Sequence, residues 1–534
     1  MKLHSFIVTL LFSALLVGCA KRGYITGGPK DTIAPEIVKS NPKNYQTNFT
    51  GKTIRIDFSE YIKIKDINKQ LIISPPMAKK PNITPQGSAS KYIAIEILDS
   101  LKPNTTYSFN FGQSITDYNE GNPYSQFKYV FSTGNYVDSL KVIGKVEDAF
   151  EENTEDFVNV MLYEATTFKD STIYKDVPVY VTNTLEKNTS FSLENIKEGT
   201  YYIAALKDKN NDFKFQAKSE KIAFLKEPIK LPSKEQYTLK LFKEKHPLKT
   251  FKPTQESNNK LFLGFEGDPK NLKISYKKNG VVEPLLHTRH PGENKDTLQL
   301  FIPKNIKDSI AVLVERESYS KTYNVKINNL KEADSLLITL KDATHNTYKD
   351  LPKLKTSTPL KKINESLIHL IRKDSSKVSF STKINVYNQE VELVFDKEEN
   401  ENYTLKIYPN AFEDIYDTKN DSLQFTFASG QLSDYGNLNL RLKNCKKFPF
   451  VVELLADDKT VVGTAYCEKE TSVFFEAIKP SLYTVRIYYD ENKNKEWDTG
   501  NLLEKRQPEL LFYMPGKIDV RANWDVDQEF ELTN

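Results

Sequence analysis

The sequence predicts an all-β protein built from several β-sandwiches in tandem. Segments such as KTIRIDFSE alternate apolar and polar residues, which is the period of a half-buried strand. Thr, Tyr, Phe, Val and Ile dominate these segments, and clusters of Gly, Pro, Asn and Asp separate them at short intervals. Helical periodicity is scarce: KINESLIHLIRKD, around residues 363–374, is a short helical candidate that could equally be a strand. Because the chain has 534 residues, too many for one core, we expect several domains.

The composition is that of a folded protein with a mixed, solvated surface. Apolar residues make up 39% of the chain and aromatic residues 12%, which suffices for buried cores. The 75 basic and 71 acidic residues are interspersed and leave a formal net charge of only +4. Since no basic face emerges from this pattern, we expect no nucleic-acid partner.

The first residues, MKLHSFIVTLLFSALLVGC, predict export. An apolar run from Phe6 to Val17 follows Lys2 and is too short to span a membrane. The ending Leu-Val-Gly-Cys resembles the bacterial lipobox, which implies that residues 1–18 are a lipoprotein signal peptide and that Cys19 carries lipid. The alternative is a plain signal peptide with a chance cysteine. Multiple acyl chains on Cys19 would tether the protein stably to the outer membrane, with the periplasmic or the cell-surface face left open.

Residues 35–134 carry a recognisable set of features. These are Pro35 with Asn41-Pro42, Phe58-Ser59-Glu60, Leu101 to Tyr107 (LKPNTTY), Asp117 with Gly121-Asn122, and Phe131-Ser132-Thr133-Gly134. The segment resembles the bacterial Ig-like domains of surface-layer proteins and lipoproteins. With GGPKDTIAP before it, it also looks like a group of Ig-like lipoproteins of Bacteroidota. The resemblance implies a spacer or binding platform and brings no biochemical activity with it.

Part of this pattern recurs later in the chain. Residues 402–430 repeat the order of residues 106–134, a tyrosine strand, an Asp-containing loop and a closing Phe-x-Phe strand. Three residue pairs match at one offset: Tyr107 with Tyr403, Phe131 with Phe427, and Gly134 with Gly430. The repeat predicts a second Ig-like domain over residues 336–432.

A sharper repeat links residues 191–216 with residues 473–498. Glu, Ile, Lys, Tyr, Asp and Asn recur at a constant offset, and Phe215 matches Trp497. Both copies resemble the transthyretin-like or carboxypeptidase-regulatory-like sandwich, in which a strand leads into an Asp/Asn-rich hairpin loop. The predicted organisation is a signal peptide (1–18), a lipidated tether (19–34), an Ig-like domain (35–134), a transthyretin-like sandwich (135–245), an unassigned sandwich (246–335), a second Ig-like domain (336–432) and a second transthyretin-like sandwich (433–534).

The loops of this repeat hold oxygen side chains at four matching places. The first copy has Asp208, Asn210, Asp212 and Gln216, and the second has Asp490, Asn492, Asn494 and Asp498. Carboxylate and amide oxygens at this spacing suit calcium. The turn glycine and the final glutamate of an EF-hand are absent, and two lysines would repel a cation. The alternative is a hairpin loop whose Asp and Asn side chains bond their own backbone. Calcium is therefore one hypothesis for the loop from Asp490 to Asp498.

Cys445 and Cys467 lie on neighbouring strand-like segments, LRLKNCKKF and GTAYCEKE. An exported compartment permits a disulfide between them, and two free thiols are the alternative.

No catalytic motif emerges from the sequence. His287 and His290 in HTRH would face opposite sides of a strand, and no nucleophile elbow, P-loop or HExxH motif is present. The recurrent Asp-Ser/Thr-apolar triplets, such as Asp99-Ser100-Leu101, are similar to the O-glycosylation acceptor of exported Bacteroidota proteins, and a turn before a strand explains them equally.

The sequence therefore predicts a non-enzymatic, lipid-anchored string of β-sandwiches. We expect a scaffold or accessory subunit of a cell-envelope complex, with an outer-membrane β-barrel as the partner. The alternative function is a surface lipoprotein that binds glycans or proteins for nutrient capture or adhesion.

Overall fold

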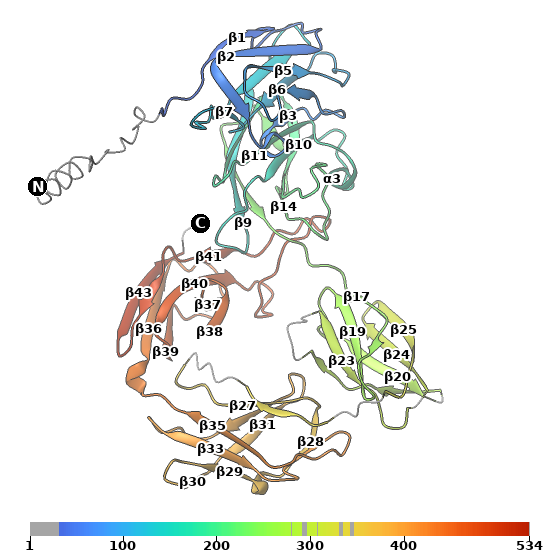
Figure 1. Ribbon diagram of the computed structural model, residues 1–534, viewed down its shortest axis with the longest axis vertical. Helices are drawn as coiled ribbons and strands as arrows, with labels where there is room; N and C mark the ends of the chain where they lie inside the picture. The colour runs from blue at the N-terminus through green and yellow to red at the C-terminus, as the bar shows by residue number, and fades with distance from the viewer. Residues whose placement is uncertain are drawn as a thin grey trace, which may run out of the picture.

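The computed structural model describes residues 31–278, 280–290, 296–306, 308–330, 335–341 and 347–532. The described strands pair into five β-sandwiches, so the predicted all-β fold class is confirmed (Figure 1). Within these ranges no helix has the length and apolar character needed to cross a membrane. The predicted signal peptide, Cys19 and the tether as far as residue 30 lie outside the described residues.

The first sandwich packs a sheet of order β1-β2-β5-β4, with β7 beside β2, against the sheet β3-β6-β8. As predicted, Ile54, Ile56 and Phe58 on β2 all point into its core. Its elements are β1 (Ile37–Asn41), β2 (Thr53–Ile64), α2 (Ile67–Gln70), β3 (Ile72–Ser74), β4 (Asn82–Thr84), β5 (Ser90–Glu96), β6 (Thr106–Asn110), β7 (Ile115–Asp117) and β8 (Lys128–Ser132).

The second sandwich pairs the sheet β11-β10-β13-β14, with β15 beside β13, with the sheet β12-β9-β16. Strand β10 is buried on both faces, because the outer face of its sheet supports a second apolar cluster that includes residues of the first and fifth sandwiches. The elements are β9 (Leu140–Asp148), β10 (Asn159–Glu164), α3 (Thr172–Lys175), β11 (Tyr180–Asn183), β12 (Ser190–Ile196), β13 (Gly199–Leu206), β14 (Ile222–Phe224), β15 (Ile229–Leu231) and β16 (Gln236–Leu241).

The third sandwich, left unassigned by the sequence, has a sheet of order β17-β19-β23-β22, with β18 beside β19, and a second sheet, β21-β20-β24-β25. Its strands are β17 (Lys249–Thr250), β18 (Thr254–Gln255), β19 (Lys260–Glu266), β20 (Lys273–Lys278), β21 (Val281–Pro284), β22 (His287–Arg289), β23 (Thr297–Phe301), β24 (Ser309–Arg316) and β25 (Tyr319–Lys326).

The fourth sandwich has the sheets β26-β27-β32-β31 and β30-β29-β33-β35 and the short pair β28-β34. The segment around 363–374 forms a single 3-10 turn and then a strand. The elements are β26 (Ile338–Leu340), β27 (Lys353–Thr356), β28 (Leu360–Ile363), η1 (Glu365–Leu367), β29 (Ile368–Ile371), β30 (Lys377–Val378), β31 (Ser381–Asn385), β32 (Glu390–Val394), β33 (Asn402–Ile407), β34 (Phe412–Asp414), β35 (Leu423–Ala428) and η2 (Leu432–Asp434).

The first and fourth sandwiches share a tyrosine corner. Tyr107 lies opposite Phe131 and Tyr403 opposite Phe427, and in both pairs the ring centroids are 5.4 Å apart. The Tyr107 hydroxyl accepts a hydrogen bond from the backbone N–H of Lys102 at 2.9 Å, and the Tyr403 hydroxyl accepts one from Glu398 at 2.8 Å. The repeated sequence pattern thus reflects the same arrangement in both sandwiches, a tyrosine that packs on the last strand and bonds the backbone before its own strand.

The fifth sandwich repeats the topology of the second. Its sheets have the orders β38-β37-β40-β41, with β42 beside β40, and β39-β36-β43, and in both small sheets the last strand runs parallel to the first. The predicted repeat is therefore a repeat of structure. The strands are β36 (Gly436–Lys443), β37 (Phe450–Ala456), β38 (Thr460–Cys467), β39 (Ser472–Ile478), β40 (Ser481–Tyr489), β41 (Leu511–Tyr513), β42 (Ile518–Val520) and β43 (Asp525–Glu531).

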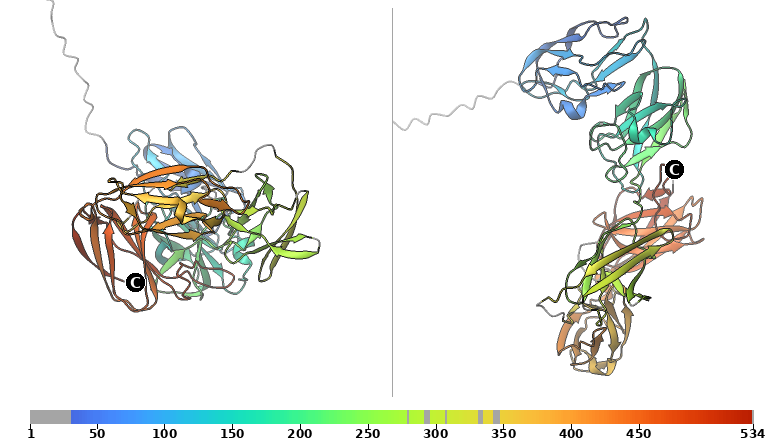
Figure 2. Two further views of the ribbon diagram at one scale, coloured as in Figure 1. Left: turned by 90° about the horizontal axis from the view of Figure 1, so that it is seen from below. Right: turned by 90° about the vertical axis from the view of Figure 1, so that its right-hand side faces the viewer.

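The last four sandwiches form a closed circuit. In Figure 1 the chain descends through the third sandwich, crosses at the bottom through the fourth, and returns through the fifth to the second. Figure 2 shows the same sandwiches edge-on, from below and from the side. The Tyr416 hydroxyl ties the fourth sandwich to the third by donating to the Asn259 and Ile302 carbonyls, each at 2.9 Å. Tyr348 of the fourth donates its N–H to the Ala477 carbonyl of the fifth at 2.8 Å.

Candidate functional site

The two Asp-rich loops of the repeat each lie at a junction between sandwiches. We call residues 208–220 the first loop and residues 490–509 the second loop. Each begins at the end of the equivalent central strand, β13 in the second sandwich and β40 in the fifth. The first loop faces the first sandwich, and the second loop faces the second sandwich. The candidate site residues therefore belong to domain junctions.

The second loop is organised around the fully buried carboxylate of Asp490. Its Oδ1 accepts a hydrogen bond from the backbone N–H of Asn494 at 3.0 Å, and its Oδ2 accepts one from Lys495 at 2.8 Å. A short acceptor side chain that bonds backbone groups a few residues ahead closes a tight turn. Asp490 thus holds the backbone of the loop through two of its N–H groups.

The four residues predicted as calcium ligands do come together. Oδ2 of Asp498 accepts hydrogen bonds from Nδ2 of Asn492 at 2.5 Å and of Asn494 at 2.7 Å. Its Oδ1 accepts from Lys245 of the second sandwich at 2.8 Å. Both carboxylate oxygens of Asp498 thus already accept hydrogen bonds from within the protein. This is the arrangement expected of a hairpin loop held by its own side chains. Over the described ranges no three His, Cys, Asp or Glu side chains form a metal-holding group, and calcium here stays a prediction.

Two glutamates complete the loops and were missed in the sequence. Glu509 accepts from the backbone N–H of Glu491 at 2.8 Å and of Asp498 at 2.9 Å. Glu220, fully buried, does the same for Lys209 at 2.8 Å and Gln216 at 2.9 Å. Burial raises the pKa of both carboxyls. They lie at different distances from the aspartate that starts each loop, so a search at constant offset does not pair them.

Asp208 organises the first loop as Asp490 organises the second. Its Oδ1 accepts from the backbone N–H of Asn210 at 3.0 Å and of Asn211 at 2.6 Å, and its Oδ2 accepts from Phe213 at 2.8 Å. The Gln216 side chain donates to Asp212 Oδ2 at 3.0 Å and accepts from Asn210. The matched positions of the repeat thus perform the same backbone-bonding task.

The second loop closes the circuit of sandwiches. Thr499 donates its hydroxyl to the Lys243 carbonyl at 2.8 Å, and Leu502 donates its N–H to Glu244 Oε1 at 2.6 Å. Gln507 donates its side-chain amide to the Phe224 carbonyl at 2.9 Å. The first two bonds join the second loop to the segment just after β16, some 250 residues earlier, and no sequence pattern predicted them.

Aromatic and small residues pack the same contact. The Phe150 ring lies 4.8 Å from the Trp497 ring, and the Arg486 guanidinium lies 4.3 Å from the Phe150 centroid. Gly500 is buried against Phe242: a Cβ at Gly500 would lie 2.6 Å from that ring and 2.8 Å from the Arg506 carbonyl oxygen. Only a residue without a side chain allows this approach.

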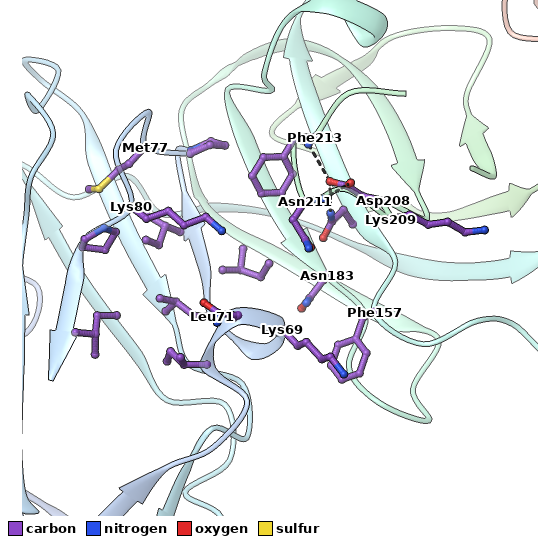
Figure 3. Close-up of a pocket in the computed structure, with 18 of the residues that line it drawn as sticks. Lys69, Leu71, Met77, Lys80, Phe157, Asn183, Asp208, Lys209, Asn211 and Phe213 are labelled. Atoms are coloured by element: carbon purple, nitrogen blue, oxygen red, sulfur yellow. Dashed lines mark hydrogen bonds between the residues drawn. The ribbon is translucent and has the colours of Figure 1, made fainter. Parts of the chain in front are cut away.

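The first loop lines a cavity of about 480 Å³ between the first and second sandwiches (Figure 3). Asp208, Asn211 and Phe213 form one wall, and the segment from Ile67 to Gln86 forms the wall opposite. The junction is held by the N–H of Val181, which donates to Ser74 Oγ at 3.1 Å. An ion pair joins Lys128 to Glu194 at 2.9 Å.

Cys445 and Cys467 are free thiols in the structure, and a disulfide between them stays a prediction. Cys467 is buried in the core of the fifth sandwich, and Cys445 packs against the same core from the end of β36. Burial raises the pKa of both thiols, that of Cys467 to about 11. A raised pKa favours the protonated thiol over the thiolate.

The two histidines of HTRH make aromatic contacts instead of a shared site. The His287 ring lies 6.5 Å from Tyr387, and the His290 ring lies 4.9 Å from Phe262, each edge to face. Cys19, the predicted lipidation site, lies outside the described residues.

The comparison with protein families agrees with the fold of the first sandwich. Residues 31–133 match the family model of the bacterial Ig-like domain. No curated protein matches the chain. Among solved structures, the S-layer protein SbsC is 12% identical with a TM-score of 0.15, and the match covers 87% of this chain and 68% of that one. The BSP domain of a biofilm-associated protein is 8% identical with a TM-score of 0.13, covering 89% and 97%. Domains MG0-NIE-MG1 of alpha-2-macroglobulin from Escherichia coli are 11% identical with a TM-score of 0.13, covering 55% and 97%.

The family match spans the whole first sandwich, including the loop that Asp117 organises through N–H groups of Glu120, Gly121 and Asn122. The second and fifth sandwiches repeat one topology, and the first and fourth share the tyrosine corner. Residues 31–133 are therefore identified as a bacterial Ig-like domain, and four further β-sandwiches follow it among the described residues.

Proposed function

We propose that the chain is a non-enzymatic outer-membrane lipoprotein that serves as a scaffold or accessory subunit of a cell-envelope complex. The observation that carries the proposal is the closure of the fifth sandwich onto the second. The partner class is an outer-membrane β-barrel, reached from a lipid anchor at Cys19.

Closure supports a scaffold because it restricts how the domains move. Sandwiches joined only in series would swing about each connection, which is the usual behaviour of domains with small interfaces. A contact between the second and fifth sandwiches constrains the third and fourth as well, since both ends of that segment are held. A frame of this kind presents several surfaces at constant separation, which a multi-component partner requires.

Purification in mild detergent followed by mass spectrometry tests the proposal. We expect a β-barrel protein to co-purify in stoichiometric amount with the wild-type chain, and less of it with Gly500→Ala, which crowds Phe242 at the closure. Gly264→Ala is the matched control, because its added Cβ meets nothing closer than the Phe251 ring at 3.5 Å. Retention on a glycan array without any protein partner would sink the scaffold proposal.

A glycan- or protein-binding surface lipoprotein is the second candidate, and one observation favours it. Tyr61, Tyr92 and Tyr118 of the first sandwich are exposed by 56%, 38% and 53%. A lysine or arginine lies over each ring, with Arg55 at 3.6 Å from the Tyr92 centroid. Exposed tyrosines provide rigid contact area at low entropic cost. Loss of glycan or protein binding in Tyr61→Ala with Tyr118→Ala would support this function.

The anchor and its membrane face are tested separately. Metabolic labelling with a palmitate analogue should mark the wild-type chain and leave Cys19→Ser unmarked. Protease treatment of whole cells then distinguishes the surface from the periplasmic face, since only surface-exposed sandwiches would be digested.

A further inference from the structure

The cavity between the first and second sandwiches has the size of a small-molecule site. Its volume of about 480 Å³ lies within the range that such sites occupy. Both walls come from structured elements: α2, β3 and β4 with their connections on one side, and the first loop with Phe157, Asn159 and Asn183 on the other. Figure 3 shows side chains from both sandwiches converging there.

Asn183, at the end of β11, has a buried side-chain oxygen that lacks a hydrogen-bond partner among the described residues. The residue is 7% exposed and lines the cavity, and its Oδ1 has no hydrogen bond to any described residue. In Figure 3 it lies between the wall of Asp208 and Asn211 and that of Leu71 and Lys69. Buried polar groups in folded proteins are nearly always paired. Rotation of the carboxamide would present its oxygen to a hydroxyl or N–H donor held in the cavity.

Two lysines without an ion-pair partner among the described residues line the same cavity. Lys69 and Lys80 line the first-sandwich wall, and neither has an ion-pair partner among the described residues. The one carboxylate that lines the cavity belongs to Asp208, and backbone N–H groups of its own loop already engage it. The cavity therefore favours an anion.

Two aromatic residues of the cavity are held in an unusual backbone conformation. Phe157 has φ of 53° and Phe213 has φ of 58°, and they are the two phenylalanines with positive φ among the described residues. Left-handed backbone is disfavoured for bulky side chains, and such residues gather at sites of function. Both rings add apolar surface to the wall formed by the first loop and its neighbours.

We propose that this junction cavity binds a small amphipathic anion. Its carboxylate, sulfonate or phosphate pairs with Lys69 and Lys80, its apolar body lies against Phe157 and Phe213, and a hydroxyl or N–H bonds the Asn183 amide. Because both sandwiches contribute, occupancy also strengthens their contact. Such a site is independent of the envelope partner proposed above.

Anilinonaphthalene sulfonate is a suitable probe, since it combines aromatic rings, a sulfonate and one N–H. A fluorescence titration would use the full chain carrying Cys19→Ser, which needs no detergent. We expect one saturable site. Lys69→Gln with Lys80→Gln should weaken binding about tenfold and Asn183→Leu about fivefold, the usual scale for a lost ion pair or hydrogen bond. Lys230→Gln, on β15 outside the cavity, is the matched control and should bind as wild type.

The uncharged N-phenylnaphthylamine, which keeps the rings and the N–H, should bind about tenfold more weakly. Equal affinity of the two probes, or of wild type and the double lysine variant, would overturn the proposal, as would the lack of a saturable site. Hydrogen exchange at β11 checks that Asn183→Leu is folded. If Asn183→Leu is not folded, Phe213→Leu is used in its place, and it too should bind the probe more weakly than wild type.

Discussion

The first and second loops share a sequence signature and a way of folding, but they contact different neighbours. In both, an aspartate at the end of the central strand bonds backbone N–H groups and a glutamate farther on bonds two more. The first loop lines a cavity beside the first sandwich. The second loop continues through Thr499, Gly500 and Leu502, which bind the second sandwich and close the circuit.

The comparison distinguishes the residues that fold the loop from the residues that contact a neighbouring sandwich. The shared aspartates and amides satisfy the loop's own backbone, so they recur wherever this sandwich recurs. Thr499, Gly500 and Leu502, which contact the second sandwich, lie beyond the matched positions of the repeat. A motif that looks like a ligand site can thus be a folding element whose outward-facing residues carry the function.

Replacing the first aspartate of each loop should have the largest effect. Asp490→Ala removes a fully buried carboxylate that accepts from two backbone N–H groups and should destabilise the fifth sandwich by about 2–3 kcal/mol. Asp208→Ala, at a half-buried position, should cost about 1–2 kcal/mol. Hydrogen exchange of β40 and β13 measures the two losses. Asp519→Ala, an exposed residue, is the control, and equal losses in both loops would contradict the difference in burial.

Gly500→Ala should disrupt the contact of the second loop with the second sandwich and leave the fold of the loop intact. The added Cβ would overlap the Phe242 ring, so the fifth sandwich should separate from the second at a cost of about 1–3 kcal/mol. Small-angle X-ray scattering should show a larger radius of gyration than for wild type and for the Gly264→Ala control. An unchanged radius would mean that the closure tolerates the displacement.

Phe150→Leu should weaken the same contact from the second sandwich. It removes a ring contact with Trp497 and a cation–π contact with Arg486, together worth about 1–2 kcal/mol. Fluorescence reports it well, because the chain has two tryptophans and the change concerns Trp497. We expect a red shift as Trp497 gains water. Phe251→Leu, at an exposed ring of the third sandwich, should show none.

The smallest effect on stability should come from protonation of Asp498 at low pH, which removes its ion pair with Lys245. Burial opposes ionisation of Asp498, but bonds from Lys245 and Asn492 outweigh it and lower the pKa of this carboxyl. A lowered pKa stabilises the folded state above the unfolded value of about 4, and the gain is lost as pH falls through the folded value. Lys245 is half exposed, so we expect about 0.5 kcal/mol or less.

Asp498→Asn tests this pair. If the pair holds the second and fifth sandwiches together, the radius of gyration of the wild type should rise between neutral pH and about pH 3. This rise should be smaller in the variant, which has no carboxylate to protonate at position 498. Identical pH profiles of variant and wild type would remove the pair from the closure.

Much of the fold follows from local sequence. Ile54, Ile56 and Phe58 alternate and are all buried, because each strand pattern specifies one buried face. The match of Tyr107 with Tyr403 predicted a repeated segment, and the structure adds that both tyrosines form the same corner. The loop residues from Asp490 to Asp498 were found as a group for the same reason, since their partners lie within a few residues. Glu509 and Glu220 were not found, because the second loop is longer than the first. The two glutamates therefore lie at different sequence distances from Asp490 and Asp208, although they make equivalent hydrogen bonds.

The sequence by itself determined the strands, the repeated sandwiches and the self-bonded loops, because periodicity and short-range hydrogen bonds are encoded in neighbouring residues. Only the tertiary structure decided that the fifth sandwich returns to the second and that Asn183 faces the cavity with its Oδ1 unpaired. Contacts such as Thr499 to Lys243 and Gly500 to Phe242 join residues far apart in the chain. Which surfaces meet depends on the shape of whole domains, and no local pattern records it.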